Sequence, residues 1–198
     1  MIKYNNSNTK YSFNEIILGG SIMPFYEFEG KRPKIGENSF VHPQATVIGE
    51  VNVGNNCYVG AGAVLRGDYG SIEIGNGSNI QEIVLMHAEP GTSAVIGENV
   101  LVGHAAIIHG PCVIHDRVII GMGSLLSNGC EMCEDSFLAA GSVLPPGRII
   151  PAHQLAMGNP AVAVKEVSGN LAQYNTIAVK LYQDLAIRCQ TGLKLIEL

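Results

Sequence analysis

The stretch IGENVLVGHAAIIHGPCVIHDRVIIGMGSLL, residues 96–126, carries a branched or long apolar residue at every sixth position. The series starts at Ile96 and runs to Leu144 without a slip, and shorter series span residues 35–65 and 74–86. Most of these apolar positions are followed four residues later by a small residue, such as Ala106 or Cys112. A period of six matches neither a helix nor a single strand, but it fits a short strand and a turn repeated many times.

The repeat indicates how the chain buries its apolar residues, because stacked coils cover sheet faces that no single repeat could hide. The pattern resembles that of the hexapeptide-repeat superfamily, in which three hexads form one triangular coil. We therefore predict an all-β fold, a left-handed parallel β-helix with a C-terminal α-helix. Gly often follows the apolar position, as at Gly103 and Gly121, and we attribute this to the unusual backbone of a corner.

The predicted boundaries are an N-terminal extension at residues 1–22, the β-helix domain at 23–160 and a C-terminal helical segment at 161–198. The second boundary falls within the turn sequence GNPA, residues 158–161. Beyond it, apolar residues step by three and four, as on one face of an amphipathic helix. These residues are Leu171, Tyr174, Ala178, Leu181 and Leu185.

Composition excludes several classes of protein. The formal net charge of -5 gives no cationic surface for nucleic acid. No apolar run approaches the roughly 20 residues that span a bilayer, and no secretory signal is evident, so we expect a cytoplasmic protein with a small-molecule substrate. Three of the 5 cysteines fill small core positions. Cys130 and Cys133 form a CxxC, but the second pair that such a zinc site needs is missing.

Counting the hexads shows on which face of the predicted prism each histidine lies. Extra residues after Leu65 and after Met86 are interpreted as corner loops, which places Leu65, Met86 and Ile108 on one face in successive coils. The residues that follow them, Arg66, His87 and His109, then stack about 4.8 Å apart. This spacing lets two imidazoles converge on one Zn²⁺.

His104 follows Val102 on a different face of the predicted prism. It cannot easily join His87 and His109 within one chain, but it can do so across an interface. We therefore predict a cyclic homotrimer with one metal site at each interface between subunits. His42, His115 and His153 are expected to be ordinary surface or core-edge residues without a second ligand.

Three stretches together carry a closer resemblance: LRGDYGSIEIGNGSNIQE (65–82), MHAEPG (86–91) and LVGHAAIIHG (101–110). They resemble the γ-class carbonic anhydrase family, and within it the phenylacetate-degradation and carnitine-operon proteins. The resemblance implies Zn²⁺, or Fe²⁺ or Co²⁺, held by His87 and His109 of one subunit and His104 of the next. It also implies roles for five further residues near that site. Arg66 and Asp68 tie subunits together, Asn79 and Gln81 lie beside the metal-bound water, and Tyr182 reaches toward the site from the helix.

The implied reaction is attack of metal-bound hydroxide on carbon dioxide, because three neutral imidazoles leave Zn²⁺ one open position. We expect the reaction to be slow. Tyr69 stands where related proteins have an acidic residue, and Glu89 is the only acid in the short loop, so the proton relay is poor. Glu82 and Ile83 also replace the usual Asp and Asn. The alternatives are an acyl-CoA thioester hydrolase of phenylacetate or carnitine metabolism, a superfamily acyltransferase, and a trimer with a structural role.

Overall fold

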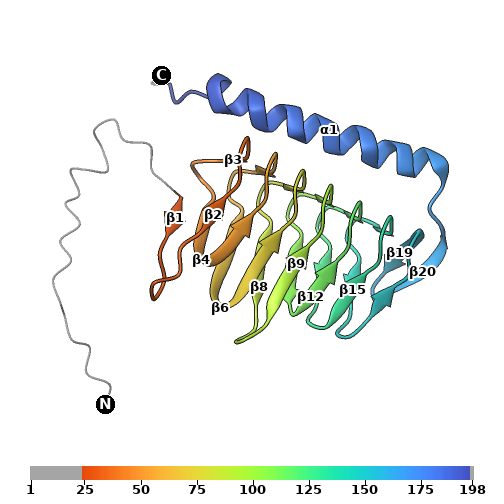
Figure 1. Ribbon diagram of the computed structural model, residues 1–198. Helices are drawn as coiled ribbons and strands as arrows, with labels where there is room; N and C mark the ends of the chain where they lie inside the picture. The colour runs from red at the N-terminus through yellow and green to blue at the C-terminus, as the bar shows by residue number, and fades with distance from the viewer. Residues whose placement is uncertain (1–23, 197–198) are drawn as a thin grey trace, which may run out of the picture.

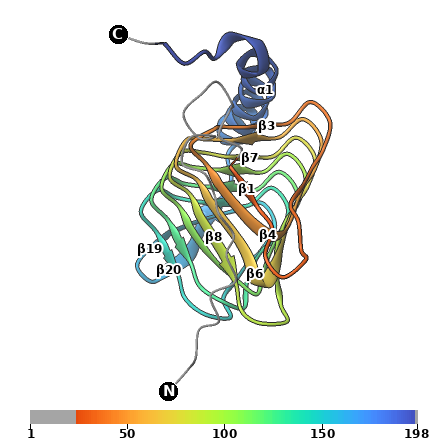
Figure 2. The ribbon, with the colours of Figure 1, turned by 90° about the vertical axis from the view of Figure 1, so that its left-hand side faces the viewer.

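The computed structural model describes residues 24–196, which form a left-handed parallel β-helix with a single helix laid along it (Figure 1). Viewed along its axis, the stack of coils has a roughly triangular outline, and the helix lies outside one of its edges (Figure 2). The predicted fold class is therefore confirmed. The predicted N-terminal extension lies outside the described residues.

The strands belong to two sheets that wrap around one interior. The 12-stranded sheet contains β1 (Phe25–Tyr26), β2 (Lys34–Ile35), β4 (Thr46–Val53), β6 (Val64–Ile74), β8 (Leu85–Ala88), β9 (Ser93–Ile96), β11 (Ile107–Gly110), β12 (Cys112–Ile114), β14 (Leu125–Leu126), β15 (Cys130–Met132), β17 (Val143–Leu144) and β18 (Ile149–Ile150). The 8-stranded sheet contains β3 (Phe40–Val41), β5 (Tyr58–Val59), β7 (Asn79–Ile80), β10 (Leu101–Val102), β13 (Ile119–Ile120), β16 (Phe137–Leu138), β19 (Gln154–Gly158) and β20 (Ala161–Glu166).

The sixth-position residues fill the interior of the prism, as the period predicts. Leu65 pairs with Met86 and Met86 with Ile108 in the parallel ladders, and Ile108 pairs in turn with Leu126. All four side chains are 0% exposed. The three cysteines at small positions are buried as well, and all five are free thiols.

One of the two predicted corner loops is wrong. The extra residues after Leu65 belong to β6, which pairs with β8 through its first residues and with β9 through its last. A single strand therefore turns the corner without a loop. The second insertion does form a turn, which closes through a hydrogen bond from the Thr92 amide to the Glu89 carbonyl.

The glycines after the apolar positions also have a different reason from the one we expected. Gly103 and Gly121 do not have the positive φ that favours glycine. Instead, a Cβ at Gly121 would collide with the backbone of Ala139 and Ala140 in the next coil. The close stacking of coils, rather than corner strain, requires glycine there.

The C-terminal segment is only partly helical. Residues 161–166 form β20, which pairs antiparallel with β19 and ends the stack. Pairing with β19 accounts for this strand, and its two valines favour it, because β-branched residues suit strands better than helices. Helix α1 then spans Gly169–Gly192. It packs on the 8-stranded sheet through Ala178 and Val179, which contact Leu101 and Ile119. No helix within residues 24–196 is long and apolar enough to cross a membrane.

Candidate functional site

His87 and His109 lie side by side on adjacent coils. They are direct partners in the ladder between β8 and β11, and their ring centroids are 5.4 Å apart. Arg66 occupies the same position one coil earlier, opposite His87. The stacking predicted for these three residues is confirmed. Together with Asp68 they are called the His87 group below.

Asp68 holds the His87 group together. One carboxylate oxygen lies 3.1 Å from His87 Nε2 and accepts the Tyr69 amide at 2.8 Å, and the other accepts Arg66 Nη1 at 2.6 Å. Burial tends to raise the pKa of Asp68, but the Arg66 and Tyr69 hydrogen bonds outweigh it and hold this pKa below its usual value. Asp68 is therefore charged at neutral pH. Arg66 and Asp68 pair with each other within one chain, and their role in tying subunits together stays a prediction.

His87 is a neutral imidazole at neutral pH. Burial lowers its pKa, and the neighbouring Arg66 charge adds to this effect, while Asp68 opposes it only in part. Donation of Nε2–H to Asp68 fixes the tautomer in which Nδ1 carries a free lone pair. That nitrogen can accept a proton or bind a metal ion.

A second set of residues surrounds His104, which follows β10 on the 8-stranded sheet. Its Nδ1 lies 2.7 Å from Glu82 Oε2, and its amide donates to Gln81 Oε1 at 3.2 Å. Gln81 Nε2 donates to Asn79 Oδ1 at 3.0 Å. Both amide side chains are buried, so Gln81 is fixed beside His104.

Tyr58 also belongs to this second set, although we did not predict it from the sequence. Its hydroxyl donates to Glu82 Oε1 at 2.8 Å. The ring of Tyr182, from α1, packs on Tyr58 with centroids 5.3 Å apart, so Tyr182 approaches the set through Tyr58. Tyr58 pairs with Asn79 in the ladder from β5 to β7. The six-residue period could therefore have located it. Tyr58, Asn79, Gln81, Glu82, His104 and Tyr182 are called the His104 group.

The two groups remain apart in a single chain. Within residues 24–196, no three His, Cys, Asp or Glu side chains come together in a way that could hold a metal ion. This agrees with the placement of His104 on a different face from His87 and His109. A site containing all three imidazoles therefore requires a second copy of the chain.

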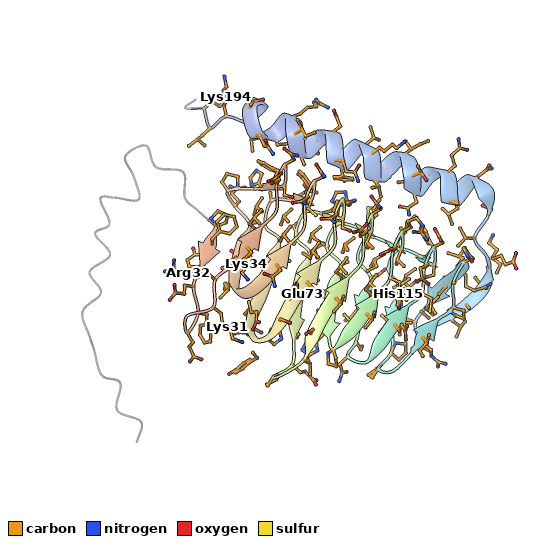
Figure 3. All side chains as sticks on the ribbon, in the orientation of Figure 1. Lys31, Arg32, Lys34, Glu73, His115 and Lys194 are labelled. Atoms are coloured by element: carbon orange, nitrogen blue, oxygen red, sulfur yellow. The ribbon has the colours of Figure 1, made fainter. Side chains whose placement is uncertain are left out.

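The remaining histidines and the loop acid have local partners. His42 Nδ1 accepts the Gln44 amide. His115, on the side of the prism that carries β12 and β15 (Figure 3), lies 2.8 Å from Glu131 through Nε2 and 3.6 Å from Glu134 through Nδ1. Because these carboxylates face opposite ring nitrogens, they do not converge on one point. Glu89 accepts a hydrogen bond from Asn128 at 3.2 Å, which restrains it as a proton carrier.

Comparisons with known proteins agree with this architecture. The family described as bacterial transferase hexapeptide (six repeats) matches residues 32–67 and 93–128. The carnitine operon protein CaiE of Salmonella newport is 42% identical over 171 residues, which cover 86% of each chain. A Bacillus cereus crystal structure, provisionally assigned as an acetyltransferase, is 30% identical with a TM-score of 0.82, and the match covers 85% of this chain and 98% of that one. A hexapeptide transferase family protein from Anaplasma phagocytophilum is 32% identical with a TM-score of 0.79, at the same coverage of both chains.

Proposed function

Because the chain belongs to the hexapeptide-repeat family of bacterial transferases, which includes CaiE, we propose that it transfers an acyl group from a thioester to a small acceptor. The acetyltransferase and transferase assignments of two structural relatives support this class of reaction. The observation that carries the proposal is the neutral His87 imidazole held by Asp68.

His87 acts as the general base in this reaction. Its free Nδ1 takes the proton of an acceptor O–H or N–H while the acceptor atom attacks the thioester carbonyl. A bond forms between the acceptor and the acyl carbon, the carbon–sulfur bond breaks, and the leaving thiolate takes up a proton. Asp68 stabilises the imidazolium that forms in between. With water as the acceptor, the same steps give thioester hydrolysis.

Thiol release from acetyl-CoA and longer acyl-CoA thioesters tests the proposal, with and without amine and alcohol acceptors. His87→Ala should lower kcat by about 10²–10⁴-fold, the usual contribution of a general base. His153→Ala is the matched control. This side chain is 70% exposed, and its ion pair with Asp135 is long at 3.9 Å and therefore weak. Equal thiol release by wild type and His87→Ala would refute the role of His87.

The side-by-side imidazoles of His87 and His109 favour a second candidate, metal-dependent hydration of carbon dioxide. We propose that a homotrimer brings His104 of a second copy to His87 and His109, and that these three residues hold Zn²⁺, Fe²⁺ or Co²⁺. The donor set fits such an ion, because metal-bound histidines commonly donate their second ring nitrogen to a carboxylate. Asp68 and Glu82 provide these carboxylates. A bound Zn²⁺ would make water a nucleophile at neutral pH.

Metal content separates the two candidates. We expect wild type to contain about one ion per chain, and His104→Ala and His109→Ala to contain little. Mixing these two variants under conditions of subunit exchange should restore part of the metal, since some interfaces then combine three intact histidines. Exchanged mixtures that stay free of metal would rule out the shared site. If thiol release continues after a chelator has removed the metal and carbon dioxide hydration is undetectable, the second candidate is rejected and acyl transfer remains.

A further inference from the structure

The Glu82 side chain connects three successive coils of the prism. Its Oε1 accepts the hydroxyl of Tyr58 from the coil before at 2.8 Å, and its Oε2 lies 2.7 Å from Nδ1 of His104 in the coil after. The register of these coils is fixed, because β7 pairs with β5 on one side and with β10 on the other. Both carboxylate oxygens of Glu82 are therefore engaged within one chain.

The neighbouring backbone leaves room for the Glu82 carboxylate. A Cβ at Gly60 would lie 2.7 Å from Glu82 Oε1 and equally close to the Glu82 amide nitrogen. Gly60 does not have a positive φ, so its missing side chain permits a close approach rather than an unusual backbone conformation. The path of the carboxylate toward Tyr58 thus requires glycine at this position.

Tyr58 is a firmly held hydrogen-bond donor. The residue is 6% exposed, and its ring packs against those of Phe40 and Tyr182, with centroids 5.9 Å and 5.3 Å away. Burial, and then the hydrogen bond to Glu82, raise the pKa of Tyr58 above its usual value, so the phenol keeps its proton at neutral pH. The hydroxyl therefore remains a donor to the Glu82 carboxylate.

The Glu82 carboxylate determines which nitrogen of His104 carries the proton. The His104 side chain is 44% exposed, so packing alone does not fix its ring. A neutral imidazole has one proton, and a carboxylate 2.7 Å from Nδ1 stabilises the proton on that nitrogen. Nε2 then keeps its lone pair.

We propose that Tyr58 is a positioning residue for His104. Its hydroxyl holds the Glu82 carboxylate against Nδ1, and this leaves Nε2 as the nitrogen that can bind a metal ion. The inference rests on the metal-binding candidate above, in which His104 joins His87 and His109 of a second copy. Tyr58 itself touches neither a metal ion nor a substrate, so it acts only through Glu82.

NMR spectra of the imidazole nitrogens in the metal-free protein test the proposal, because they distinguish a protonated nitrogen from one with a lone pair. In wild type we expect His104 to carry its proton on Nδ1. Tyr58→Phe removes one hydroxyl and keeps the packed ring. It should lower the ratio of the Nδ1–H to the Nε2–H tautomer about tenfold, as for the loss of one hydrogen bond to a charged group. Tyr174→Phe, on an exposed part of α1, is the matched control and should leave the ratio unchanged.

A second variant separates positioning from packing. Glu82→Gln keeps the size of the side chain but removes its charge, and it should lower the same ratio at least as far. Tyr58→Phe added to Glu82→Gln should then have no further effect, because two residues that act in series are not additive. The proposal is overturned if Tyr58→Phe leaves the ratio unchanged, or if it lowers the ratio equally with and without Glu82→Gln.

Zn²⁺ affinity, measured by competition with a chromogenic chelator, connects the tautomer to binding. Tyr58→Phe should weaken Zn²⁺ binding about tenfold and Glu82→Gln about 10–100-fold, the usual effect of removing a group that supports a ligand. An unchanged affinity in Tyr58→Phe would also overturn the proposal. Wild type that binds no Zn²⁺ would instead reject the metal-binding candidate, and the tautomer spectra, which use metal-free protein, judge the role of Tyr58 independently of that result.

Discussion

At the scale of single residues, the Asp68 carboxylate decides how His87 behaves. Asp68→Asn keeps the size of the side chain but removes its charge, so the imidazolium loses its stabilising partner. We expect the kcat of thiol release to fall by about 10–100-fold, while Asp184→Asn on the exposed face of α1 has no effect. Because the Asp68 charge raises the pKa of His87, its removal should also shift the acid limb of the rate profile to lower pH. An unchanged profile would assign Asp68 a purely structural role.

For single residues of the site, the sequence predicts which positions stack in one row but not which long side chains meet. Counting hexads placed Arg66, His87 and His109 in one row, because register in a parallel stack follows directly from spacing. The contact of Tyr58 with Glu82 was not predicted, since it depends on the direction in which two long side chains extend from different coils. The restraint of Glu89 by Asn128 was missed for the same reason.

At the scale of elements, glycines control how closely successive coils approach. Gly121→Ala places a methyl group against the backbone of Ala139 and Ala140, and the coils must move apart. We expect a loss of about 1–3 kcal/mol in the free energy of unfolding by urea, as for other overpacked interiors. Gly169→Ala is the control, because its new Cβ meets no described atom within 4 Å and the change should stabilise the chain by about 0.4–1 kcal/mol. Equal effects of the two substitutions would contradict the close stacking of coils.

At the scale of the whole molecule, the repeat predicted most of the fold because every coil obeys the same rule. Leu126, Leu138 and Leu144 are each 0% exposed, as their positions in the series require. The exceptions are the segments in which the six-residue repeat is interrupted or ends. The residues of β6 turn a corner as strand, and β20 reverses direction at GNPA, because pairing with neighbouring strands decides their path and the six-residue period does not describe it. Whether the His87 and His104 groups of different copies meet depends on surfaces, which a period cannot describe.

The antiparallel hairpin of β19 and β20 limits the growth of the stack. Nothing in a six-residue repeat sets a maximum number of coils, and each coil offers a ready parallel edge to the next one. β20 is the last strand of the 8-stranded sheet and runs against the others, with an irregular register between Leu155 and Ala156. An incoming coil from another molecule would meet the wrong hydrogen-bond pattern at this edge. On this face of the modular rod, the hairpin thus works as a chain terminator in the polymer sense.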